Sequence, residues 1–117
     1  MEIENSKIGQ LVIDVYQTKS YFVVQIPIAG VEEKDLEVKV ENKILFIKGK
    51  REESEEEKKE EKDYLKKECY WGPFSAEISL PEDANNSQIK ASFKKGVLLI
   101  KIPRIKKEPE KKVTIET

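Results

Sequence analysis

The feature that most constrains the fold of this chain is a repeated alternation of apolar and polar side chains with a period of two. In the run 36–41, leucine and valine alternate with glutamate and lysine. A strand with one buried face and one solvent-facing side requires this pattern. The same alternation returns in the runs 74–80 and 89–94. No long amphipathic helix competes with it, so the sequence predicts an antiparallel β protein.

Four further short runs are apolar on both faces and are rich in the β-branched and aromatic residues that suit central strands. They are 11–16, 21–26, 44–47 and 97–102. Turn-forming residues separate the runs, including Pro27, Gly30, Gly72 and Pro73. Seven or so short strands joined by tight turns predict an all-β fold, a two-sheet antiparallel β-sandwich.

Two pairs of these runs lie close enough together to form hairpins. The run 36–41 is followed by 44–49 across Asn42-Lys43, and 89–94 is followed by 97–102 across Lys95-Gly96. Two-residue connections are the commonest hairpin turns.

Much of the charge of the chain falls in one segment. The stretch from Lys50 to Asp63 contains no apolar residue, so it cannot contribute to a core. Several like charges in it stand four residues apart, which opposes an isolated helix. We therefore expect a solvated, mobile loop rather than a projecting helix. The segment 64–71 that follows regains aromatic and apolar residues, and it is a candidate for another strand at the end of this loop.

Composition excludes several kinds of chemistry. The chain has no histidine, which excludes serine triads, imidazole bases and histidine-supported zinc sites. Its glycines are isolated, so no phosphate-binding loop can form, and its carboxylates lie on solvated faces where nothing would raise a catalytic pKa. The single cysteine, Cys69, is expected to be an ordinary packed or half-exposed thiol. We predict no enzyme activity, no metal and no cofactor.

The charge balance bears on partners and location. With 22 basic and 23 acidic residues the net charge is −1, which provides no field for nucleic acid or an anionic membrane. A basic cluster near the C-terminus and three aromatic residues are the only features that favour nucleic acid: Lys106, Lys107, Lys111, Lys112, Tyr64, Tyr70 and Trp71. Interleaved acids weaken that case. One cysteine, no signal peptide and no membrane-spanning stretch predict a cytoplasmic protein.

The C-terminal segment ends in an isolated apolar pair, Val113 and Ile115, separated by Thr114. On an extended chain the two side chains point the same way, about 7 Å apart. One interpretation is a frayed tail with two incidental apolar residues. The other is a tethered peptide that adds along an exposed sheet edge, with two pockets for its side chains.

Four ordered motifs resemble those of the small heat-shock protein (α-crystallin domain) family. Ala91-Ser92-Phe93-Lys94-Lys95-Gly96-Val97-Leu98 is similar to the family's A-x-x-x-x-G-V-L signature. The others are Pro27–Val31 with Lys34-Asp35-Leu36, Leu45-Phe46-Ile47-Lys48-Gly49-Lys50-Arg51, and Glu68-Cys69-Tyr70-Trp71-Gly72-Pro73-Phe74 with Leu80-Pro81. Alanine replaces a family proline at position 29, and Cys69 and Ala76 stand where basic residues are common.

The resemblance implies an immunoglobulin-like β-sandwich that acts as an ATP-independent holdase, binding partly unfolded client proteins so that they do not aggregate. It divides the chain into a short N-terminal segment 1–9, an α-crystallin domain 10–104 and a C-terminal extension 105–117. Within the domain, the charged loop 50–69 would carry a strand exchanged with a partner to form a dimer. The dimer interface would contain Tyr64, Leu65, Lys66, Glu68 and Cys69.

The family's C-terminal I-x-I motif docks into a groove of a neighbouring dimer, and Val113 and Ile115 match that motif. The groove walls, which would also hold clients, match the two alternating runs: Leu36, Val38, Val40, Ile89, Ala91 and Phe93. The alternative interpretation is a co-chaperone module of the CS-domain type that binds a specific ATPase. Such modules commonly lack both the long loop and the C-terminal pair, so a monomer in solution would favour this alternative.

Overall fold

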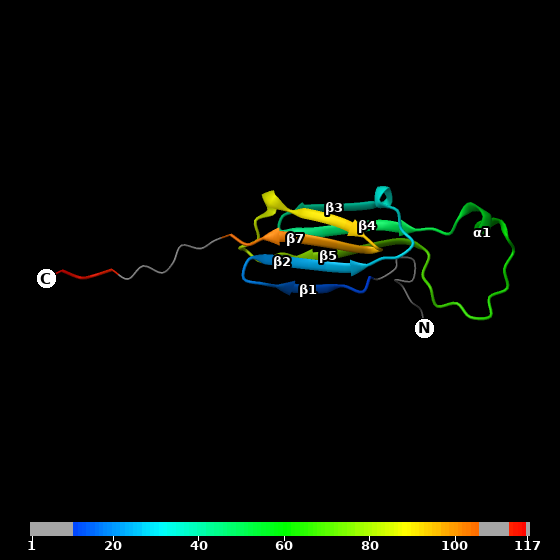
Figure 1. The fold of residues 1–117 in the computed structure, drawn as a ribbon, viewed down its shortest axis with the longest axis horizontal. Helices are drawn as coiled ribbons and strands as arrows, with labels where there is room; N and C mark the ends of the chain where they lie inside the picture. The colour runs from blue at the N-terminus through cyan, green and yellow to red at the C-terminus, as the bar shows by residue number, and fades with distance from the viewer. Residues whose placement is uncertain (1–10, 106–112, 117) are drawn as a thin grey trace.

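The structure, a computed structural model, describes residues 11–105 and 113–116. The strands form a sandwich of two antiparallel sheets (Figure 1). The first sheet has the strand order β1-β2-β7-β6 and the second has the order β3-β4-β5. The strands are β1 (Asp14–Gln17), β2 (Tyr21–Pro27), β3 (Leu36–Glu41), β4 (Ile44–Arg51), β5 (Gly72–Ser79), β6 (Lys90–Lys94) and β7 (Val97–Pro103). The predicted all-β sandwich is therefore confirmed.

The described helical segments are all short. They are the 3-10 turns η1 (Glu33–Asp35) and η2 (Asn86–Gln88) and the helix α1 (Glu55–Lys59). None is long and apolar enough to cross a membrane. The predicted N-terminal segment 1–9 and the lysines at 106, 107, 111 and 112 lie outside the described residues.

Both predicted hairpins are present. β3 pairs with β4 across Asn42 and Lys43, and β6 pairs with β7 across Lys95 and Gly96. All four turn residues have positive φ, at 52°, 63°, 53° and 76° in chain order. Two consecutive positive φ angles define the type I′ turn, whose twist matches that of the flanking strands. Three of the four residues are not glycine, so the strand pairing on either side must hold them in this conformation.

The core fills the space between the two sheets. Its buried side chains come from alternate positions of the strands, as the period-two pattern predicts. They include Phe22, Val24 and Ile26 of β2, Leu45 and Ile47 of β4, Phe74 of β5, and Leu98, Ile100 and Ile102 of β7. Because both central strands of the first sheet and the central strand of the second contribute, this one core joins the two layers.

The run 11–16 corrects one prediction. Apolar residues on both of its faces indicated a central strand, but β1 is the edge strand of its sheet and all four of its residues are exposed. Leu11 and Ile13 pack against the core, whereas Val15 and Tyr16 are 45% and 46% exposed. Apolar composition alone does not distinguish a central strand from an edge strand whose free side is uncovered.

The charged segment corrects a second prediction, because the helix α1 forms within it. Ser54 caps the helix by accepting a hydrogen bond from the backbone N–H of Glu57 (3.2 Å), and Lys58 pairs with Glu55 (3.6 Å). The helix ends at Lys59, before the like charges spaced four apart would face each other along it. The segment 64–71 forms no strand within its own chain.

Candidate functional site

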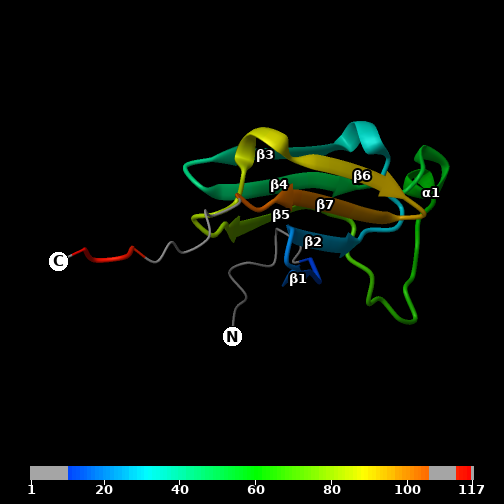
Figure 2. The same cartoon turned by 60° about the vertical axis from the view of Figure 1, so that its left-hand side comes forward.

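An open groove lies between the edge strands β3 and β6, which belong to different sheets but run side by side at one border of the sandwich (Figure 2). Its volume is about 470 Å³. Four predicted residues line it: Leu36 and Val38 from β3, and Ala91 and Phe93 from β6. They meet there because alternation sends these side chains inward, while the two strands are the last of their sheets.

The groove has features that sequence analysis did not identify. Buried Leu98 of β7 contributes to its lining, and Glu33 and Lys94 place one charge of each sign beside it. Glu33 lies in the 3-10 turn before β3, which the alternation pattern did not predict. The proximity of Lys94 to Leu36 follows from packing of the two sheets, so no local sequence pattern indicates it.

Two predicted groove residues lie outside this lining. Val40 and Ile89 are half-buried, and both pack against the main core. The groove thus occupies the Leu36 and Phe93 end of the two strands rather than their full length.

Both walls of the groove carry free strand edges. In the described chain β3 pairs only with β4, and β6 pairs only with β7. Their outer backbone N–H and C=O groups can therefore accept another strand, as exposed edges do. The groove combines apolar side chains with unpaired backbone, which suits it to an extended peptide.

The predicted C-terminal anchors are not in the groove of their own chain. Val113 and Ile115 are 79% and 86% exposed, and residues 113–116 form no helix or strand. Neither side chain lines the groove. Their exposure leaves both apolar side chains available for contact.

Arg51 fastens the two ends of the charged segment to the domain. Its Nε donates a hydrogen bond to the backbone carbonyl of Ala29 (2.8 Å), and its Nη1 donates to the carbonyl of Tyr70 (3.3 Å). The hydroxyl of Tyr70 in turn donates to the carbonyl of Pro73 (2.7 Å). This network closes the base of the segment where it leaves β4 and where it returns to β5.

Beyond its base the segment projects past the end of the sheets (Figure 1), and its shortest ion pair joins Lys62 to Glu53. The Nζ of Lys62 donates to the Glu53 carboxylate (2.8 Å). This hydrogen bond raises the pKa of Lys62 above its usual value of 10.5. The charged form of the lysine is thus favoured wherever Glu53 is ionised.

The predicted dimer-interface residues are all exposed in this segment. Tyr64 is flanked by the ammonium groups of Lys62 and Lys67, at 5.8 and 4.7 Å from its ring centre, while Leu65 is 98% exposed. The other predicted residues, Lys66, Glu68 and Cys69, are exposed as well. Nothing in the described part of the chain covers Leu65.

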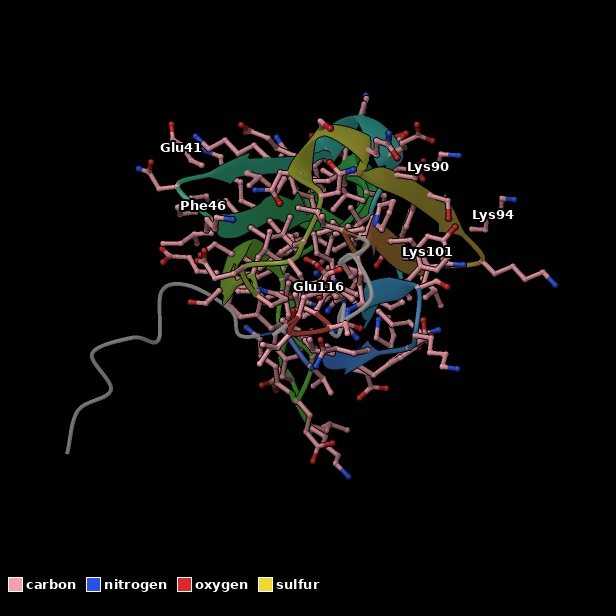
Figure 3. The ribbon with its side chains drawn as sticks, turned by 90° about the vertical axis from the view of Figure 1, so that its left-hand side faces the viewer. Glu41, Phe46, Lys90, Lys94, Lys101 and Glu116 are labelled. Carbon is pink, nitrogen blue, oxygen red and sulfur yellow. The ribbon has the colours of Figure 1, made fainter. Side chains whose placement is uncertain are left out.

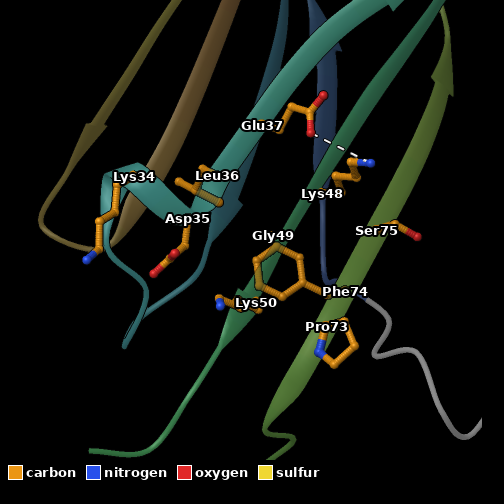
Figure 4. A pocket seen from close by; sticks show the side chains of 10 residues that line it. All are labelled: Lys34, Asp35, Leu36, Glu37, Lys48, Gly49, Lys50, Pro73, Phe74 and Ser75. Carbon is orange, nitrogen blue, oxygen red and sulfur yellow. Dashed lines mark ion pairs between the residues drawn. The ribbon is translucent and has the colours of Figure 1, made fainter.

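A second hollow of about 540 Å³ opens at the end of the sheet formed by β3, β4 and β5 (Figure 4). Leu36, Gly49 and Phe74 lie in its lining, and charged residues surround them, including the ion pair Lys48–Glu37 (3.7 Å). Leu36 borders both this hollow and the groove. The sequence contained no signal for it.

No group of three or more His, Cys, Asp or Glu side chains that could hold a metal ion occurs within residues 11–105 and 113–116.

Comparison with known proteins adds to this geometry. A family model described as the Hsp20/alpha crystallin family matches residues 14–116, which is most of the chain. Among curated proteins, the chain is 36% identical over 103 residues to small heat shock protein C2 of Rickettsia felis, covering 88% of this chain and 66% of that protein. It is also 36% identical over 111 residues to small heat shock protein C4 of the same organism, covering 95% and 67%. The chain thus spans about two thirds of the length of these relatives.

Solved structures agree on the fold. A small heat-shock protein from Xylella fastidiosa superposes with a TM-score of 0.74 at 27% identity, covering 92% of this chain and 96% of that one. Heat shock protein 16.0 from Schizosaccharomyces pombe gives a TM-score of 0.78 at 24% identity, covering 97% and 80%. These comparisons do not support the alternative of a CS-type co-chaperone.

Proposed function

The chain belongs to the Hsp20/alpha crystallin family, and we propose that it acts as an ATP-independent holdase that keeps partly unfolded proteins from aggregating. The open groove between β3 and β6 carries this proposal. An unfolding protein exposes apolar side chains together with unpaired backbone groups. The groove offers Leu36, Val38 and Phe93 to the former and two strand edges to the latter, so it complements both.

The holdase proposal is tested by light scattering from a heat-aggregating client, with and without equimolar protein. Ala91 is exposed in the groove, so Ala91→Glu places a charge among apolar side chains without removing core packing. Desolvating that charge should weaken client binding about tenfold or more. Ser79→Glu, on an exposed position of β5, is the matched control.

Two results would count against the proposal. One is failure of the parent protein to suppress scattering at equimolar ratio. The other is equal protection by Ala91→Glu and Ser79→Glu, since this would place client binding elsewhere.

We further propose that the C-terminal pair docks in the groove of another copy. Val113 and Ile115 are exposed, and their i, i+2 spacing matches the alternation of the groove walls. Val113→Ala with Ile115→Ala removes five side-chain carbons that docking would bury, which amounts to about 4 kcal/mol of docking energy. The double variant should have a smaller mass by light scattering, whereas Thr114→Ala should not. An unchanged mass would refute docking.

Dimerisation is proposed to use the charged loop 50–69. Its segment with Tyr64, Leu65, Lys66, Glu68 and Cys69 would pair with the free edge of β1 in a second copy, where Val15 and Tyr16 are half exposed. The proposal is supported by the exposure of Leu65 and by the absence of a described strand on that edge of β1. Leu65→Asp should raise the dimer dissociation constant at least tenfold, since about 2 kcal/mol of leucine burial is lost.

We also propose a cytoplasmic location. The single cysteine, Cys69, has no partner for an intramolecular disulfide, which suits a reducing compartment. Fractionation of cells that produce the protein tests this, and recovery in an extracellular or membrane fraction would contradict it.

A further inference from the structure

The outer face of the four-stranded sheet carries an excess of positive charge at its β6 and β7 side. By strand register, Lys90 lies directly opposite Lys101, and Lys94 lies opposite Val97, with all three lysines pointing away from the core. Figure 3 shows them on one side of the sandwich, with Glu41 and Phe46 on the other. We call Lys90, Lys94 and Lys101 the lysine face.

The lysine face is not neutralised within the described part of the chain. No ion pair there involves any of its three lysines, and the Lys101 ammonium instead lies 4.5 Å from the ring centre of Tyr21. Among the outward positions of this sheet the one carboxylate is Asp14, on the far strand β1.

The other sheet is different. Its outward charges are mixed in sign along the strands, and Lys48 pairs with Glu37 at 3.7 Å. Like charges directly opposite each other on neighbouring strands destabilise a sheet. The Lys90 and Lys101 pair therefore has a cost that an anionic partner would relieve.

The same chain contains a segment of opposite charge. Residues 52–63, here called the acidic loop, carry eight carboxylates and three lysines, a net charge of −5. Ion pairs within the segment and to its base involve Glu52, Glu53 and Glu55. The remaining five carboxylates are exposed and form no ion pair in the described residues: Glu56, Glu57, Glu60, Glu61 and Asp63.

The acidic loop does not reach the lysine face of its own chain. It projects beyond the end of the sheets, and no ion pair joins the two in the described structure (Figure 1). A loop that extends away from its own domain can contact a neighbouring one.

We propose that the lysine face is a contact surface for the acidic loop of a second copy of this chain. The inference rests on the proposed function in one respect, because the same loop leads into the segment 64–69 proposed to pair with a partner. It adds a partner for the acidic half of the loop, and it assigns a role to a sheet face of which only Lys94 borders the groove. A second copy is favoured over nucleic acid because the acidic loops of the assembled protein would compete with phosphate at high local concentration.

The test reverses charge on each side of the contact. The face variant combines Lys90→Glu with Lys101→Glu, which replaces one like-charge pair by another and so leaves the fold comparably stable. The loop variant combines Glu60→Lys with Glu61→Lys, which lie after α1. A control with the same net charge as the face variant carries Lys19→Glu and Lys39→Glu, at exposed lysines outside the lysine face that form no ion pair in the described residues.

Self-association of the full chain is measured by sedimentation over a dilution series. At about 30 mM NaCl, where screening is weak, the face variant and the loop variant should each dissociate at about tenfold higher concentration than the parent. The chain that combines both variants should regain most of the affinity, and the control should resemble the parent. At about 300 mM NaCl the differences should fall below roughly threefold.

Three results would overturn the inference. The first is parent-like association of the face variant at low salt. The second is a combined variant no better than either alone. The third is a loop variant that associates normally while the face variant loses affinity for a single-stranded oligonucleotide, which would assign the face to nucleic acid. Client protection by the parent is scored separately, so loss of the charge contact and loss of holdase activity are distinguishable.

Discussion

Gly49 allows a sharp test of how tightly this sandwich is packed. It lies within β4 and does not adopt the left-handed backbone that would by itself require glycine. At an ordinary strand position, replacing glycine by alanine stabilises a protein by about 0.4 to 1 kcal/mol, because the unfolded chain loses freedom. The surroundings of Gly49 predict the opposite sign.

A Cβ atom at position 49 would lie 2.6 Å from the backbone oxygen of Asp35, 2.8 Å from Cζ of Phe74 and 3.1 Å from Cδ2 of Leu36. The first contact is with backbone, and Phe74 is buried, so neither can move freely. Figure 4 shows the Phe74 ring beside Gly49. Forcing a methyl group into a packed site costs about 1 to 3 kcal/mol.

Gly49→Ala should therefore lower the free energy of unfolding by about 1 to 2 kcal/mol once the entropic gain is subtracted. For a domain of this size the melting temperature should fall on the order of 10 °C. Urea unfolding followed by fluorescence of Trp71 and by circular dichroism measures the change, and Lys48→Ala at the exposed neighbouring position is the control.

A Gly49→Ala variant as stable as the parent, or more stable, would refute the packing argument. An equally large loss of unfolding free energy in Lys48→Ala would show that β4 is sensitive to any substitution, rather than to crowding at Gly49.

Three further predictions concern the polar contacts that position loops. Arg104→Ala should cost about 1 to 3 kcal/mol in urea unfolding, because it removes the 2.9 Å hydrogen-bonded ion pair with half-buried Asp83; a loss below about 0.5 kcal/mol would contradict this. Arg51→Gln should speed proteolysis within 52–69 several-fold with little change in melting temperature, and parent-like cleavage would contradict the role of Arg51 in holding the base of the segment. The hydrogen bond between Lys62 and Glu53 raises the pKa of Lys62 above 10.5, so the contact should persist until the pH rises through that raised pKa and should then be lost. An NMR titration in which the Lys62 ammonium has its usual pKa would disprove the contact.

The strands and hairpins were predictable from sequence because they depend on local information. A buried face every second residue specifies a strand, and β3 is predicted to the residue, from Leu36 to Glu41. The position of β1 was not predictable in this way. Whether a strand is central or at an edge depends on how distant segments pair, and the composition of 11–16 is the same in either case.

For the groove, too, one part was predictable from the sequence and another part was not. Alternation identified Leu36, Val38, Ala91 and Phe93 as side chains that face one way. These side chains face each other because β3 and β6 are the edge strands of the two sheets and lie at the same border of the sandwich. Glu33 and Lys94 enter the lining through that packing, so no window of sequence could identify them.

By itself the sequence determined where most of the strands and the tight turns occur, which family the motifs resemble and that one segment cannot join a core. These properties depend on neighbours a few positions away. Only the tertiary structure decided which strand edges stay open and which of the predicted groove residues line the groove. It also showed that, within the described residues, one sheet face carries lysines without ion pairs and a projecting loop carries carboxylates without ion pairs. Those properties depend on the order of strands in the sheets and on which surfaces the chain leaves uncovered, and both are set by contacts between residues far apart in sequence.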